Sequence, residues 1–115
     1  MDRPRILFVC GRNQWRGPTA ERIYRNDTRV EVRSAGVSGK SPHPITADDV
    51  SWAGLVVVME QRYRARIPAT FRDHPNLPRV VSLDIPDEYK FMDPELIQLI
   101  REGVEFHLRH EFHTA

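Results

Sequence analysis

The chain has 115 residues, a formal net charge of +1 and 40% hydrophobic residues. This length suits one core, so we expect a single domain over residues 1–115, and the balanced charge favours neither nucleic acid nor a membrane surface as partner. One cysteine excludes an intrachain disulfide, and no apolar stretch approaches the roughly 18 residues of a membrane span. We therefore expect a cytoplasmic protein.

Strands and helices are predicted in strict alternation along the chain. The predicted strands are 6–9, 30–35, 55–59 and 79–83, and the first and third are continuous apolar runs that suit burial on both faces. The predicted helices are 18–26, 46–53, 60–71 and 94–112, and Pro68 is expected to end or kink the third. Such alternation predicts a three-layer α/β fold, in which helices cover both faces of a four-stranded parallel sheet.

Reactive side chains follow two of the predicted strands. Cys10 ends the first strand, and the acidic segment 84–93 follows the fourth. Ligands of open parallel sheets bind outside the carboxyl ends of the strands. The site is therefore predicted to lie between these two segments.

The loop after the first strand has the features of an oxyanion site. Cys10 and Arg16 are separated by five residues, and a helix is expected to begin at Gly17-Pro18. Backbone N–H groups in such a loop form an anion nest, the helix N-terminus adds partial positive charge, and Arg16 can make two parallel bonds to phosphate oxygens. The loop residues expected to bind a phosphate or sulfate ion are Gly11, Arg12, Asn13, Gln14 and Trp15.

The same groups are expected to act on the thiol of Cys10. A free cysteine has a pKa of about 8.5, and a fall of about three units corresponds to about 4 kcal/mol in favour of the thiolate. Such a thiolate could attack phosphorus and form a phosphocysteine. The alternative is that Cys10 is only a small buried hydrophobic residue at the end of a strand.

The sequence resembles the low-molecular-weight protein tyrosine phosphatase family over nearly its whole length, and in particular a shorter bacterial branch of it. The resemblance rests on Leu7-Phe-Val-Cys10, Asn13, Arg16, Pro18, Ala20, Glu21, Arg33-Ser-Ala-Gly36, Asp84-Ile-Pro-Asp87 and Phe91-Met-Asp-Pro-Glu-Leu96. It implies the sheet order 2-1-3-4 and hydrolysis of phosphotyrosine, in a phosphorylated protein, or of a small aryl phosphate, with no cofactor and no metal. Cys10 would be the nucleophile and Arg16 the phosphate clamp, and the Asn13 side chain would stabilise the loop.

A proton donor is needed near the leaving oxygen when a phenolate is expelled. The resemblance gives this role to Asp87, although Glu88 stands where the family has a proline. Tyr89 falls where the family has an aromatic residue that lines the pocket. Asp93 and Asp84 remain alternative acids, and Asp93 also suits an ordinary helix cap before a proline.

Two positions depart from the family. Gly17 replaces a serine or threonine whose hydroxyl assists the thiolate; a hydrogen bond to a charged group contributes about 1.5–3 kcal/mol, so phosphocysteine breakdown is expected to be about 10–100 times slower. Gly17 also suits a helix cap. Trp15 replaces a second cysteine found in relatives, so the protective disulfide cannot form.

Two other functions stay open. Gly17 favours a phosphate- or oxyanion-binding module with weak or lost catalysis, and a single cysteine is compatible with an arsenate reductase that uses an external thiol. Three histidines at three-residue spacing and three arginines at two-residue spacing suit solvated helix faces better than a metal or nucleic-acid site. These residues are His107, His110, His113, Arg62, Arg64 and Arg66.

Overall fold

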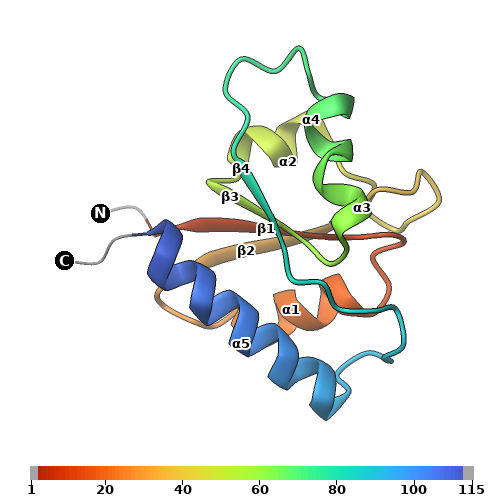
Figure 1. Ribbon diagram of the computed structural model, residues 1–115, viewed down its shortest axis with the longest axis vertical. Helices are drawn as coiled ribbons and strands as arrows, with labels where there is room; N and C mark the ends of the chain where they lie inside the picture. Colours follow the sequence, from red (N-terminus) through yellow and green to blue (C-terminus); the bar gives the residue numbers. More distant parts are fainter. Residues whose placement is uncertain (1–2, 113–115) are drawn as a thin grey trace.

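Four parallel strands form the centre of the molecule. In the computed structural model, which describes residues 3–112, they are β1 (Arg5–Cys10), β2 (Glu31–Gly36), β3 (Leu55–Val58) and β4 (Arg79–Ser82). Each neighbouring pair is parallel, and the order across the sheet is β2-β1-β3-β4 (Figure 1). The predicted α/β class and the order implied by the resemblance are both confirmed.

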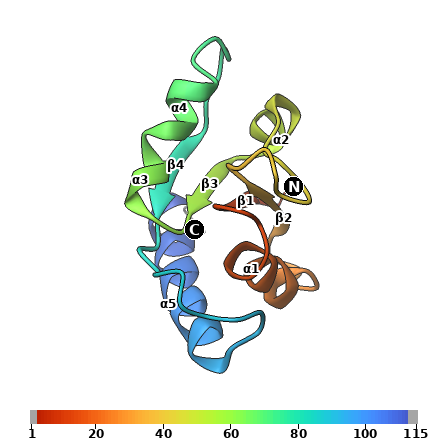
Figure 2. The same ribbon diagram turned by 90° about the vertical axis from the view of Figure 1, so that its right-hand side faces the viewer.

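Helices cover both faces of this sheet. α1 (Arg16–Tyr24) and α5 (Pro94–Glu111) lie on one face, and α2 (Ala47–Trp52), α3 (Gln61–Arg64) and α4 (Arg66–Thr70) lie on the other (Figures 1 and 2). Within residues 3–112, no helix combines the length and the apolar character that crossing a bilayer would require.

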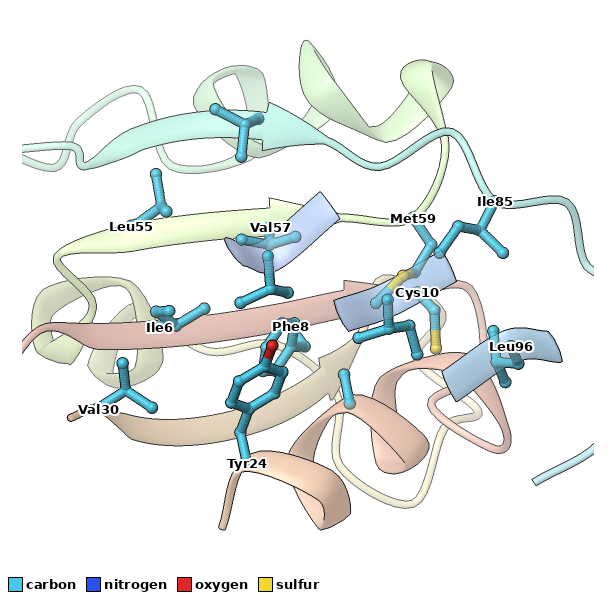
Figure 3. Packing of buried hydrophobic residues seen from close by; sticks show 14 residues of the cluster. Ile6, Phe8, Cys10, Tyr24, Val30, Leu55, Val57, Met59, Ile85 and Leu96 are labelled. Atoms are coloured by element: carbon cyan, nitrogen blue, oxygen red, sulfur yellow. The ribbon is translucent and has the colours of Figure 1, made fainter. Parts of the chain in front are cut away.

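The central strand β1 contributes to two hydrophobic cores. Successive side chains of a strand point to opposite faces. Ile6, Phe8 and Cys10 therefore face the core beneath α1 and α5, while Leu7 and Val9 face the core on the other side. Burial on both faces explains the uninterrupted apolar run that leads to Cys10, which lies at the carboxyl end of β1 (Figure 3).

Helix α1 begins two residues earlier than predicted. Its N-cap is Trp15, whose side chain makes no capping hydrogen bond, and Arg16 is the first helical residue. Pro18 therefore lies in the first turn, where a backbone N–H has no partner within the helix. The capping role predicted for Gly17 is wrong, because Gly17 is buried inside that turn.

The single helix predicted over 60–71 is divided into α3 and α4 at Ala65. Pro68 explains the position of the break. A proline has no N–H for the carbonyl four residues earlier, here that of Arg64, and its ring collides with that carbonyl. The helix is interrupted one turn before Pro68, which itself lies in the first turn of α4.

Candidate active site

A cavity of about 450 Å³ lies at the carboxyl ends of the strands. Segments that follow all four strands contribute to its wall: the loop after β1, residues 37–39 after β2, the α3–α4 segment after β3 and Asp87 after β4. The predicted site residues that line it are Cys10, Gly11, Arg12, Gln14, Trp15, Arg16 and Asp87.

The loop between β1 and α1 folds around the sulfur of Cys10. The side chain is 3% exposed, and the backbone N–H groups of Gly17, Asn13 and Gln14 donate toward Sγ. Figure 3 shows Cys10 beyond the end of the apolar run of β1, near Met59, Ile85 and Leu96. The amides therefore face inward, as an anion nest requires.

The direction of the Cys10 pKa shift differs from the prediction. Burial raises the pKa of the Cys10 thiol, and the amides of Gly17 and Asn13 and the charge of Arg16 offset only part of this effect. Removal of a thiolate from water disfavours the charged form, and here that cost exceeds the gain from the surrounding donors. The predicted lowering of the Cys10 pKa is therefore not found.

The guanidinium of Arg16 is buried and held by three groups. Nη1 donates to the carbonyl oxygen of Ile85 at 2.8 Å, Nη2 lies 2.9 Å from Oε2 of Glu60, and Nε lies 3.7 Å from Oδ1 of Asp87. The Arg16 side chain is 3% exposed. A buried charge is tolerated only where it is paired and hydrogen-bonded. These contacts fix the orientation of the guanidinium at the edge of the cavity.

Glu60 is a further member of this arrangement, and it was not among the residues predicted from the sequence. It follows β3 directly, and its carboxylate contacts both Arg16 and, at 3.2 Å, Nε of Arg62. Although burial opposes the shift, the hydrogen bond and charge of Arg16, with those of Arg62, hold the pKa of Glu60 below its usual value. Its placement at the carboxyl end of a buried parallel strand was the signal that could have identified it.

The three candidate aspartates occupy different environments. Asp87 lines the cavity and is 59% exposed at its side chain. Asp84 accepts a hydrogen bond from Oγ of Ser82 at 2.7 Å, and Asp93 caps α5 by accepting one from the N–H of Glu95 at 2.9 Å. Asp87 is the only one of the three that lines this cavity.

The aromatic residues at the cavity are Trp15 and Tyr63, whereas Tyr89 is not part of its lining. Tyr89 packs instead against the core beneath α1 and α5. The pocket position that the resemblance gave to Tyr89 is therefore occupied by other side chains. Tyr63 was missed because it belongs to α3, far from the loop in the sequence.

Asn13 and Gly17 are packed closely behind the loop. Asn13 adopts φ 55°, a left-handed conformation that asparagine tolerates better than most residues, and its side chain is buried. A Cβ atom on Gly17 would lie 2.9 Å from Oδ1 of Asn13 and 3.2 Å from Sγ of Cys10. The asparagine amide thus fills the space that a side chain at position 17 would need.

The histidines of α5 form no metal site in the described structure. Among residues 3–112, no three side chains of the His, Cys, Asp and Glu types are grouped so that they could hold a metal ion. Nδ1 of His110 lies 2.7 Å from the carbonyl oxygen of Phe106, and His107 is half-buried. His113 lies outside the described residues.

Comparison with known proteins identifies the fold. No protein-family model and no curated protein matches the sequence. The tyrosine phosphatase Wzb from Escherichia coli K30, solved with phosphate, matches with a TM-score of 0.71 at 19% identity over 95% of this chain and 99% of that one. SP-PTP, a low molecular weight protein tyrosine phosphatase from Streptococcus pyogenes, matches with a TM-score of 0.71 at 17% identity over 96% and 95%.

A third solved structure broadens the comparison. The YwlE arginine phosphatase from Geobacillus stearothermophilus matches with a TM-score of 0.65 at 22% identity over 97% of this chain and 99% of that one. The chain has the fold of the low-molecular-weight protein tyrosine phosphatases.

Proposed function

We propose that the protein is a cysteine-dependent phosphatase that hydrolyses phosphotyrosine or similar aryl phosphates through a phosphocysteine. One observation carries this proposal: the sulfur of Cys10 lies where backbone amides converge, at a cavity that Arg16 and Asp87 also line. A fold shared with tyrosine and arginine phosphatases supports the reaction class.

The proposed first step is attack on phosphorus. After the thiol proton is lost to solvent, the Cys10 sulfur forms a bond to phosphorus while the bond from phosphorus to the aryl oxygen breaks. The loop amides and Arg16 stabilise the charge on the phosphoryl oxygens. These donors are held in place before the substrate binds, because the loop amides already point inward and Arg16 is fixed by Glu60 and Ile85.

Asp87 is proposed to serve both proton transfers. In the first step its carboxylic acid gives a proton to the departing aryl oxygen. In the second, the resulting carboxylate takes a proton from a water molecule that attacks phosphorus, the bond to sulfur breaks, and phosphate leaves. Its position beside Arg16, exposed at the cavity, supports this role over Asp84 and Asp93, which are engaged in local hydrogen bonds.

The aromatic preference is supported by the cavity wall. Trp15 lines it and is 43% exposed, so an aryl ring has a flat apolar surface to contact, whereas Tyr63 contributes to the wall from a buried position. Contacts between aromatic rings contribute about 0.5–1.5 kcal/mol beyond the area that they bury. The leaving group of the phosphate ester is therefore proposed to be a phenol such as tyrosine.

Hydrolysis of para-nitrophenyl phosphate tests the proposal. The wild-type protein should release nitrophenol, Cys10→Ser should abolish turnover, and rapid quenching should trap a phosphocysteine detectable by mass spectrometry. Phosphate binding without turnover would overturn the proposal in favour of a binding module. Thiol consumption that depends on arsenate, without phosphate release, would overturn it in favour of a reductase.

A further inference from the structure

Four arginines line the cavity together with a single carboxylate. They are Arg12, Arg16, Arg62 and Arg66, and the carboxylate is that of Asp87. The chain as a whole carries a formal net charge of only +1, so positive charge is concentrated at this place. We call Arg12, Arg62 and Arg66 the arginine rim, because all three are exposed around the loop.

The three arginines of the α3–α4 segment differ in their position relative to the cavity. Arg62 and Arg66 are four residues apart, about one helical turn, and both line the cavity. Arg64 is exposed and does not line the cavity. The two-residue spacing predicts a dispersed, solvated set, whereas the structure divides the three arginines into two rim residues and one outside the rim.

The rim is only partly neutralised. Arg62 lies 3.2 Å from Oε1 of Glu60 and stacks 4.8 Å above the ring centre of Tyr63. Neither Arg12 nor Arg66 pairs with a carboxylate in the part of the chain that the structure describes. Like charges gathered at one cavity repel, and a second anion on the ligand would relieve that repulsion.

The loop and the rim would bind different groups. The amides that converge on Cys10 and the buried guanidinium of Arg16 suit one phosphoryl group. Arg12 and Arg66 stand outside this arrangement with exposed side chains at the same cavity. Arginine binds carboxylate and phosphate through two parallel bonds, so the rim suits a further carboxylate or phosphate on the same substrate.

We propose that the substrate carries a second anionic group close to its phosphate ester, and that the arginine rim binds this group. The inference rests on the proposed phosphatase function and narrows its substrate class to acidic phosphomonoesters. The second anion is a carboxylate of a residue next to phosphotyrosine or another phosphate of the same molecule. A phosphorylated group with a cationic neighbour would be a poor substrate, because the rim would repel it.

The test compares phosphotyrosine peptides that differ only in their flanking residues. With glutamate flanks, kcat/KM should exceed that with glutamine flanks by about tenfold at low salt, and the ratio should approach one near 0.5 M salt. Lysine flanks should lower kcat/KM further. A small aryl compound with two phosphates, compared with phenyl phosphate, distinguishes a second phosphate from a flanking carboxylate. Equal kcat/KM values for anionic and neutral substrates of both kinds would overturn the proposal.

Variants identify the residues responsible. Arg66→Gln should lower the ratio of glutamate to glutamine peptide by about three- to fivefold, and Arg62→Gln should lower it as well. Arg64→Gln is the matched control, since it removes the same charge from the same segment but outside the cavity, and it should leave the ratio unchanged. An equal fall of this ratio in Arg64→Gln would show that only the net charge of the protein matters, and would overturn the proposal that the arginine rim binds the second anion.

Failure of the proposed function would be recognised separately. Hydrolysis of para-nitrophenyl phosphate, which carries no second anion, reports on the phosphatase reaction alone. Peptide binding to Cys10→Ser, measured by calorimetry, reports on the rim without any turnover. Tighter binding of the glutamate peptide to this variant supports the rim even if no substrate is hydrolysed, and equal binding of both peptides contradicts it.

Discussion

The guanidinium of Arg16 and the carboxylate of Glu60 form an ion pair, with 2.9 Å between Nη2 and Oε2, at a site where the arginine side chain is 3% exposed. The pair joins the first residue of α1 to the residue that follows β3. Because Nη1 is bound to the carbonyl oxygen of Ile85, the guanidinium cannot rotate away without the loss of both contacts. Glu60 therefore acts as a positioning residue for Arg16, the proposed phosphate clamp.

Replacement of Glu60 by glutamine should destabilise the protein and weaken the site. The change removes a charge-assisted hydrogen bond, so the free energy of unfolding should fall by about 1.5–3 kcal/mol in urea titrations. The kcat/KM for an aryl phosphate should fall as well, because the guanidinium of Arg16 loses a partner that fixes its orientation. Glu88→Gln, an exposed change nearby, is the control. Equal effects of the two changes would argue against the positioning role.

The Glu60 carboxylate also predicts a pH dependence of stability. Because its pKa is lowered in the folded protein, its contribution is present above the unfolded value of about 4.3 and is lost as the pH falls through the lower folded value. The wild-type protein should therefore lose more stability below pH 4.3 than Glu60→Gln does. Thermal unfolding of both proteins between pH 3 and 7 checks this. If the stability of both proteins depended on pH in the same way, the lowered pKa of Glu60 would be contradicted.

The thiol of Cys10 should react with iodoacetamide increasingly as the pH rises past 8.5. Burial holds its pKa above the usual range, so the thiolate fraction still grows where that of a free cysteine levels off. The neutral thiol also contributes stability below the unfolded pKa of about 8.5 that is lost as the pH rises through the folded value. Mass spectrometry of the alkylated protein gives the rate. A rate that is constant from pH 6 upward would indicate a low-pKa thiolate instead.

Asp87→Asn should impair the expulsion of poor leaving groups most. Loss of a general acid lowers rates by about 10²–10⁴-fold, and less where the leaving group needs little protonation. The loss should thus be larger for phenyl phosphate than for para-nitrophenyl phosphate. Asp84→Asn and Asp93→Asn should keep the wild-type ratio between these substrates, although Asp93→Asn removes a charged cap from α5. A larger change of that ratio in either of these variants would reassign the acid.

Gly17→Ala should destabilise the protein despite the better helix propensity of alanine. The added Cβ lies 2.9 Å from Oδ1 of Asn13, and overpacking costs about 1–3 kcal/mol, whereas the propensity gain is at most about 1 kcal/mol. Gly39→Ala is the control, since a Cβ there meets nothing within 4 Å. Gly17→Ser should bring no gain in turnover, because its side chain must displace Asn13. Increased stability of Gly17→Ala would show that Asn13 moves freely.

Much of the fold could be predicted from local patterns. The apolar runs before Cys10 and in β3, together with the alternation of strands and helices, were sufficient to predict a parallel sheet covered on both faces. Two helix boundaries differ from the prediction, and both differences have local causes. Pro68 interrupts the helix one turn earlier than its own position, and α1 begins at Arg16 without a side-chain cap.

The candidate site, like the fold, could be predicted from the sequence only in part. The loop from Cys10 to Arg16 is contiguous, so its residue types and their spacing predict its shape. The sequence alone does not distinguish Asp87 from Asp84 and Asp93, since all three belong to one irregular segment. Their positions relative to the carboxyl edge of the sheet separate them. Tyr63 was missed because nothing in its own neighbourhood marks it as part of a site. Glu60 was missed although it lies close to the carboxyl end of β3, which is a signal that the sequence does contain.

By itself, the sequence determined the parallel sheet and the inward-facing loop after its first strand, because backbone periodicity and turn chemistry act over a few neighbouring residues. Only the tertiary structure decided that Glu60 holds Arg16, that the Cys10 pKa is raised and that two of three arginines face the cavity. Burial and long-range charge pairing depend on which segments meet at the sheet edge, and those distances are set by packing.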